Sequence, residues 1–272
     1  MKQFDEVYFR KYLNLLGLSK RKPSLEALKE LVSANLQLVP FENVSKLYYK
    51  KQNRLKNIPD FPQFLEGIEK YHFGGTCYSN NYYLYLLLQY LGYNVKLCGA
   101  DMNNPDVHIV SIVNIDGKEF IVDNGYAAPF SEPMPRNLNK DYTLTFGDEK
   151  YILKPKNNKG YSKLEQYWKG ELKHGYIAKP KPRKIEEFQK VIEDSYRDDA
   201  TFMNALMIAR FYNNGSLVLR NLSLIKTKGS KTRTQVINRA DIPDIVENEF
   251  GISSQIVKEV TEDLGELKDT WD

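Results

Sequence analysis

The chain has 272 residues, of which 42% are hydrophobic and 27% are charged. This composition excludes disordered, collagen-like and low-complexity chains, and the length suits up to about three small domains. The net charge is only +4, from 39 basic and 35 acidic residues. Because basic residues are barely in excess, we expect no nucleic-acid partner.

The cysteines and the apolar runs favour a cytoplasmic protein. Two cysteines, Cys77 and Cys98, cannot form a disulfide framework and suit a reducing compartment. The first residues lack the charged start and apolar core of a secretory signal. The longest apolar run, 82–91, is far shorter than the about twenty residues that cross a membrane, so we expect no membrane partner.

Residues 1–92 are expected to form a helical domain. A helix is predicted over Phe4–Leu16, and Ser24 is a suitable cap for a second helix that ends before Pro40. Asp60 caps a third helix. The helix predicted from Cys77 to Leu91 is apolar on nearly every side, which indicates a buried position.

Residues 93–184 change to a strand-rich pattern. Asp116-Gly117 predicts a two-residue hairpin turn between two of the strands. Residues 154–184 are basic and predicted to be loop-rich, ending in a linker at 179–184. The predicted strands are Val95–Gly99, Val107–Ile115, Lys118–Asp123, Tyr142–Phe146 and Lys150–Leu153.

Residues 185–272 form the third predicted domain. We expect helices over 185–193 and 199–212, a hairpin of strands 216–226 and 232–237, and a final helix over 242–250. Helices first, strands in the middle and a mixed end predict an α+β fold class.

Cys77 is the first candidate for chemistry. It follows Gly-Gly-Thr at the start of a predicted helix, where free N–H groups carry a partial positive charge that stabilises a thiolate. Most single cysteines are instead small buried hydrophobes, so this feature is weak by itself.

A nucleophilic cysteine also needs a base, and the chain has three histidines. His72 precedes the glycine turn, and His174 falls in the basic loop, where we expect it to be exposed. In the predicted hairpin, residues 115 and 118 pair. His108 and Asp123 are then diagonal neighbours on one face, with Cα atoms about 7–8 Å apart.

This geometry couples His108 to Asp123, and a carboxylate there fixes the imidazole and stabilises its cation. Nothing local shows that Cys77 meets this pair. A Cys–His–Asp triad and a structural alternative, in which Cys77 is a core residue and Asp123 serves a turn, both remain open. The order Cys, His, Asp also occurs in several thiol-enzyme folds and does not fix the reaction.

Several motifs, in order from about residue 5 to 255, resemble the arylamine N-acetyltransferases. Their joint occurrence is much more specific than any single motif. They are Val39-Pro-Phe-Glu-Asn43, Gly74-Gly-Thr-Cys-Tyr-Ser-Asn-Asn81, Val107-His-Ile-Val110, Phe120-Ile-Val-Asp-Asn-Gly-Tyr126 with Pro129 beyond, and Phe250-Gly-Ile252.

The resemblance implies a helical domain (1–92), a β-barrel-like domain (93–184) and an α/β lid (185–272) around a core like that of thiol proteases. It implies a triad of Cys77, His108 and Asp123 that moves acetyl groups from acetyl-CoA to small arylamines or hydrazines, with no metal. The substrate- and cofactor-binding residues it implies are Phe41, Gly125, Tyr126 and Phe202.

The sequence departs from the family pattern at three positions. Phe73 stands where the family usually has Arg, Ser79 where it commonly has Glu, and Asn124 where an apolar residue is frequent. Loss of Arg and Glu together removes an ion pair that would brace the Cys77 loop. The alternatives are therefore a catalytically weakened member, a transglutaminase-like or other thiol hydrolase, and an amide synthase that uses another acyl carrier.

Overall fold

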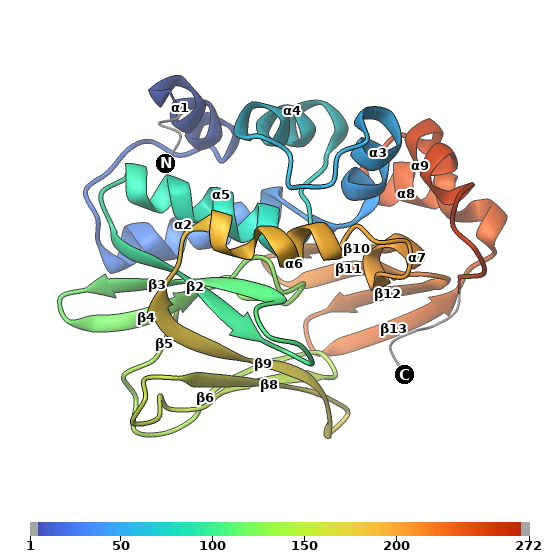
Figure 1. Ribbon diagram of the computed structural model, residues 1–272. Coiled ribbons are helices and arrows are strands. Elements are labelled where there is room, and N and C mark those ends of the chain that lie inside the picture. The colour runs from blue at the N-terminus through green and yellow to red at the C-terminus, as the bar shows by residue number, and fades with distance from the viewer. Residues whose placement is uncertain (1–4, 268–272) are drawn as a thin grey trace.

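The computed structural model describes residues 5–267. Phe4, where we expect the first helix to begin, lies outside the described residues. Helices fill the first third of the chain, and in Figure 1 they lie above the sheets. They are α1 (Glu6–Leu15), α2 (Leu25–Leu38), α3 (Val44–Asn53), α4 (Phe61–Tyr71) and α5 (Cys77–Tyr90).

Two of the predicted helix caps are confirmed. The side chain of Ser24 accepts a hydrogen bond from the N–H of Ala27 at 3.1 Å, and Asp60 accepts one from Gln63 at 2.9 Å. Helix α3 is not predicted, because no side chain caps its start and its last turn is basic and polar. The caps show how local hydrogen bonding sets where these helices begin.

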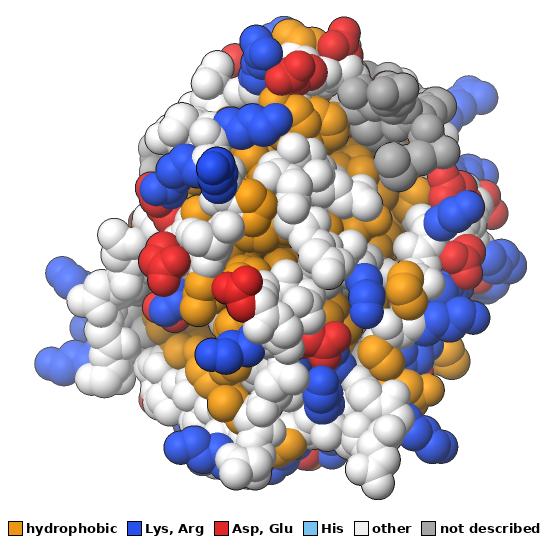
Figure 2. Space-filling view, turned by 90° about the vertical axis from the view of Figure 1, so that its left-hand side faces the viewer, with side chains coloured by type: hydrophobic (Ala, Val, Ile, Leu, Met, Phe, Trp, Pro, Cys, Tyr) orange, Lys and Arg blue, Asp and Glu red, His pale blue; other side chains and the backbone are white. Residues whose placement is uncertain are grey.

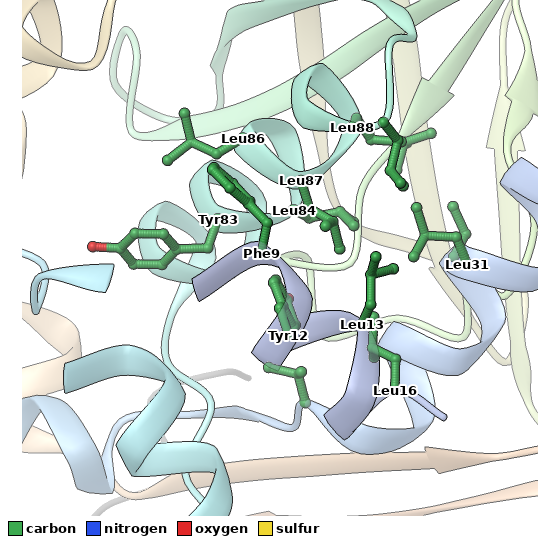
Figure 3. Close-up of a cluster of buried hydrophobic side chains, with 14 of the residues drawn as sticks. Phe9, Tyr12, Leu13, Leu16, Leu31, Tyr83, Leu84, Leu86, Leu87 and Leu88 are labelled. Atoms are coloured by element: carbon green, nitrogen blue, oxygen red, sulfur yellow. The ribbon is translucent and has the colours of Figure 1, made fainter. Parts of the chain in front are cut away.

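Helix α5 is the centre of the helical core, as its apolar sequence predicts. Its side chains meet those of α1, α2 and α4 (Figure 3). Phe61 of α4 stacks on Tyr83 of α5 with ring centroids 5.0 Å apart. Burial on this scale fixes the helix axis, and so it fixes the position of Cys77 at the first residue of α5.

An eight-stranded antiparallel sheet curls beneath the helices like a barrel (Figure 1). Its strand order is β5-β4-β3-β2-β9-β8-β7-β6. The predicted hairpin register is confirmed, because Ile115 pairs with Lys118 and Ser111 with Val122. The strands are β2 (Asn94–Asp101), β3 (His108–Ile115), β4 (Lys118–Val122), β5 (Met134–Pro135), β6 (Tyr142–Phe146), β7 (Glu149–Leu153), β8 (Ser162–Trp168) and β9 (Glu171–Pro182).

The loop-rich prediction for residues 154–184 is wrong. Strands β8 and β9 occupy most of this segment, and β9 lies between β2 and β8 in the sheet. The expected linker therefore begins as a strand. Lys179 forms ion pairs with Asp101 and Asp106 at 2.6 Å, so opposite charges hold this basic stretch against the sheet.

A second, five-stranded sheet of order β1-β10-β11-β12-β13 occupies the C-terminal third. Its first strand comes from the helical region and pairs Phe41 with Ala209. The strands are β1 (Phe41–Glu42), β10 (Met207–Tyr212), β11 (Gly215–Arg220), β12 (Ser223–Lys228) and β13 (Lys231–Val236). The helices here are η1 (Ile185–Phe188), α6 (Gln189–Asp194), α7 (Thr201–Asn204), η2 (Arg239–Asp241), α8 (Ile242–Phe250) and α9 (Ser254–Thr261).

Two further predictions are wrong in this region. The helix expected over 199–212 is only the short α7, and the rest is β10, whose buried run of Met, Ile and Ala has no period that separates strand from helix. The strand expected over 216–226 is two strands, β11 and β12, that turn between them. The final helix over 242–250 is confirmed as α8.

Charged side chains of both signs are spread over the surface. Figure 2 shows one face, on which Lys and Arg are scattered among acidic and apolar side chains. Across residues 5–267, every helix is too short or too polar to span a bilayer.

Candidate active site

Cys77 lies at the N-terminal end of α5, and its side chain is partly exposed. The preceding Thr76 is extended, so the first N–H groups of the 14-residue helix remain open beside the sulfur. The Cys77 thiol also donates to the carbonyl of Val107 at 3.7 Å. The other cysteine, Cys98, is fully buried in the sheet.

The turn before Cys77, residues 74–76, is held by Glu42 rather than by an ion pair. The carboxylate of Glu42 accepts hydrogen bonds from the N–H of Gly74 at 3.0 Å and of Ser45 at 2.7 Å. Its own N–H donates to Gly75. Phe73 and Ser79 are buried without charge, and Phe73 packs among tyrosines. Among the described residues, no Lys or Arg pairs with Glu42, yet the turn is braced.

Replacing Glu42 with Gln is expected to lower the free energy of unfolding by about 1–3 kcal/mol, because one buried N–H donor then faces the amide NH₂. Burial raises the pKa of Glu42, although the N–H groups of Ser45 and Gly74 favour its charged form. Urea unfolding measures the change, with Glu69→Gln, an exposed partner of Lys11, as the control. Equal stability of both variants would contradict the bracing role.

His108 and Asp123 form a buried pair, as the hairpin register predicts. Nε2 of His108 lies 2.9 Å from Oδ2 of Asp123, and the side chains are 1% and 0% exposed. Burial lowers the pKa of His108, but the charges of Asp123 and Cys77 oppose it and raise this pKa to about 10. The second ring nitrogen, Nδ1, is buried without a hydrogen-bond partner in the described structure. It is the nitrogen left for the sulfur.

Asn81 joins the helix end to this pair. Its Nδ2 donates to Oδ1 of Asp123 at 2.8 Å and to the carbonyl of Ile109 at 2.6 Å, while its Oδ1 accepts the N–H of Asn124 at 3.0 Å. Asn81 is four residues after Cys77, so both lie on one face of α5. That spacing is a signal that the sequence reasoning missed. The departure at Asn124 also has a role, because its Nδ2 caps the carbonyl of Phe130 at 3.1 Å.

A cavity of about 540 Å³ opens beside the sulfur. Its walls come from α5, from the loop after β2, and from α6 and α7, which run near α5 in Figure 1. Its lining residues are Lys46, Thr76, Cys77, Tyr78, Met102, Asn103, Asn104, Pro105, Val107, His174, Val191, Asp194, Ser195, Ala200, Thr201 and Phe202.

The four residues expected to bind substrate take different places. Phe202 lines the cavity, and the ring of Phe41 packs against it with centroids 5.6 Å apart. Tyr126 lies 5.6 Å from the His108 ring. Gly125 faces the start of α5, where an added Cβ would come within 2.9 Å of Cys77 Cα.

His174, expected in an exposed loop, instead lies on β9 and lines the cavity. Its Nδ1 is 2.7 Å from the hydroxyl of Tyr126. Burial lowers the pKa of His174, and the charges of His108 and Arg220 lower it further. The usable signal was parity, because Tyr176 and His174 share one face of a strand.

Comparisons with known proteins agree with this site. A family model described as N-acetyltransferase matches residues 24–260. Arylamine N-acetyltransferase, pineal gland isozyme NAT-3, of Gallus gallus is 30% identical over 196 residues, which cover 64% of this chain and 66% of that protein. Proansamycin X synthase of Amycolatopsis mediterranei is 22% identical over 247 residues, covering 85% of this chain and 91% of that protein.

The fold is also that of a solved relative. The Mycobacterium marinum arylamine N-acetyltransferase in complex with CoA is similar with a TM-score of 0.76 and 21% identity, covering 93% of this chain and 94% of that chain. The helical region, the barrel-like sheet and the C-terminal sheet are therefore those expected from the sequence motifs. The chain belongs to the arylamine N-acetyltransferase family, a family of transferases.

Proposed function

We propose that this protein moves an acetyl group from acetyl-CoA to the nitrogen of an arylamine or hydrazine through an acetyl-Cys77 intermediate. One arrangement carries the proposal. A sulfur at a helix start opens into a cavity and lies beside a buried imidazole that Asp123 holds from behind. The CoA complex of the Mycobacterium marinum relative supports the donor.

In the first half-reaction, the Cys77 thiolate attacks the thioester carbonyl of acetyl-CoA. The bond from the carbonyl carbon to the CoA sulfur breaks, and the His108 imidazolium gives its proton to that sulfur. Asp123 holds Nε2 of His108, so that Nδ1 faces the reacting atoms. Splitting acyl transfer into two steps is the usual gain from a covalent intermediate.

In the second half-reaction, the amine nitrogen attacks the acetyl carbonyl and His108 accepts the amine proton. The bond to the Cys77 sulfur breaks, which restores the thiolate and the imidazolium. Arylamines and hydrazines are weakly basic, so their lone pair is free at neutral pH. In this proposal Phe202, supported by Phe41, forms an apolar wall for the acceptor, while Gly125 and Tyr126 shape the reacting face.

Intact-mass measurement after exposure to acetyl-CoA tests the proposal. We expect an adduct of about 42 Da, one acetyl group bound covalently, and its loss only when an arylamine is added. Cys77→Ala is expected to take up no label, and Cys98→Ala to be labelled normally, because Cys98 is buried and burial raises the pKa of its thiol to about 12. A label that disappears in buffer alone would indicate a hydrolase, and no label would indicate a catalytically weakened member.

An amide synthase is the second candidate, and the similarity to proansamycin X synthase favours it. The same measurement separates the two functions. Rapid labelling of Cys77 by thioesters on another acyl carrier, with little label from acetyl-CoA, would identify an amide synthase.

We also propose a cytoplasmic location. Both cysteines are free, and Cys77 is partly exposed. A partly exposed thiolate keeps its reactivity in a reducing compartment, where disulfides rarely persist.

A further inference from the structure

Lys46, on α3, lines the same cavity as Cys77 but has no part in the transfer steps. It is only 7% exposed. Its ammonium donates to the Ser195 hydroxyl at 2.7 Å and lies 4.2 Å from the centre of the Tyr196 ring. Among the described residues, no carboxylate forms an ion pair with it.

A buried lysine without a carboxylate is costly, because charged groups lose hydration when they are buried. Burial lowers the pKa of Lys46 to about 8, while the charge of Cys77 raises it and that of Lys50 lowers it. The side chain is therefore still mostly protonated at neutral pH. One of its three N–H donors has a hydrogen-bond partner in the described structure, which leaves two for a ligand.

The position of Lys46 limits where a matching anion can come from. It shares the cavity wall with Thr76 and Cys77, close enough to the sulfur that the two charges interact. The carboxylate that also lines the cavity, Asp194, is paired with Lys190. A group bound at Lys46 is therefore within a few atoms of the Cys77 sulfur, as the end of a short acyl chain is.

We propose that Lys46 selects acyl donors whose acyl chain ends in a carboxylate, such as malonyl- or succinyl-CoA. This inference rests on the proposed function and names its donor class. When the acyl group is on Cys77, its terminal carboxylate takes the two free N–H donors of Lys46. The resulting charge-assisted hydrogen bonds compensate the buried ammonium.

The test compares the rates at which malonyl-CoA and butyryl-CoA, of similar chain length, acylate Cys77. We expect the native protein to favour malonyl-CoA, and Lys46→Met to reduce the ratio of the two rates about thirtyfold or more, as loss of a buried charge partner does. Lys46→Gln, which keeps a donor for Ser195, provides the same test if the Met variant unfolds.

Lys50→Met is the matched control. Lys50 lies one turn further along α3, and its ammonium binds the Tyr196 carbonyl at 3.0 Å and Asp198 at 2.9 Å, outside the cavity wall. Its removal takes away the same charge from the same helix and also loosens the segment after α6. We expect the Lys50 variant to keep the native preference for malonyl-CoA.

Other outcomes overturn the inference. Equal losses with malonyl-, butyryl- and acetyl-CoA in Lys46→Met would show that Lys46 binds the CoA phosphates. A preference for 4-aminobenzoate over its methyl ester that vanishes in Lys46→Met would place the carboxylate on the acceptor. Labelling by acetyl-CoA without preference for malonyl-CoA defeats this inference alone, whereas no labelling by any thioester defeats the proposed function.

Discussion

Replacing Asp123 with Asn is expected to slow acetylation of Cys77 by about a thousandfold, since a positioned acid or base contributes about 10²–10⁴-fold. Burial lowers the pKa of His108, and the carboxylate of Asp123 opposes burial strongly enough to raise it to about 10. An amide keeps the size of the side chain but cannot stabilise the imidazolium. Acetyl-CoA labelling in a rapid-quench experiment measures the rate.

The same substitution changes how stability depends on pH. The folded-state pKa of His108 lies above the ordinary value of 6.5, so its stabilisation is complete below pH 6.5 and is lost as the pH rises toward 10. In Asp123→Asn, burial is left to lower this pKa, and the loss is expected at lower pH. NMR titration of His108 and thermal unfolding across this range follow both effects.

Asp116→Asn is the control for both experiments. Asp116 is exposed at the turn of the same hairpin, and its replacement is expected to leave the rate and the pH dependence unchanged. An Asp123→Asn protein that is acetylated at the native rate would remove this carboxylate from the mechanism.

Gly125→Ala is expected to separate Cys77 from His108. The added Cβ would lie 2.9 Å from Cys77 Cα and 2.7 Å from Nδ2 of Asn81, closer than such atoms can pack. Because one of these contacts is helix backbone, α5 must shift. A displacement of about 1 Å costs about a hundredfold in rate, and overpacking costs about 1–3 kcal/mol of unfolding free energy.

Labelling kinetics and urea unfolding measure the two effects of Gly125→Ala. The matched control is Gly265→Ala, because no atom lies within 4 Å of the Cβ added there. If Gly125→Ala labels as fast as the native protein, the contact between Gly125 and α5 does not position the sulfur.

Local rules predicted the catalytic pair but not its meeting with the sulfur. The register of one hairpin places His108 beside Asp123, and a helix start places open N–H groups beside Cys77. Whether α5 packs against β3 is decided by long-range burial and by the hydrogen bonds of Asn81. Neither can be read from neighbouring residues, so the family resemblance was needed to join the three residues.

The missed features share a physical cause. Lys46 lies on a helix with a weak apolar period, and His174 lies on a strand that is rich in Lys and Pro. Both side chains reach the cavity through contacts between segments that are distant in the chain. Phe202 was placed by resemblance, although the residues after it form β10 instead of the predicted helix.

The two-residue strand β1 has a consequence for protein synthesis. Phe41 pairs with Ala209 on one side and bridges to Gly75 on the other, so the turn that carries the nucleophile is fastened to a strand made much later. On the ribosome, the thiol cannot reach its working environment until residues near 209 have emerged. A nascent chain is thereby kept from reacting with cellular thioesters before its final third is present.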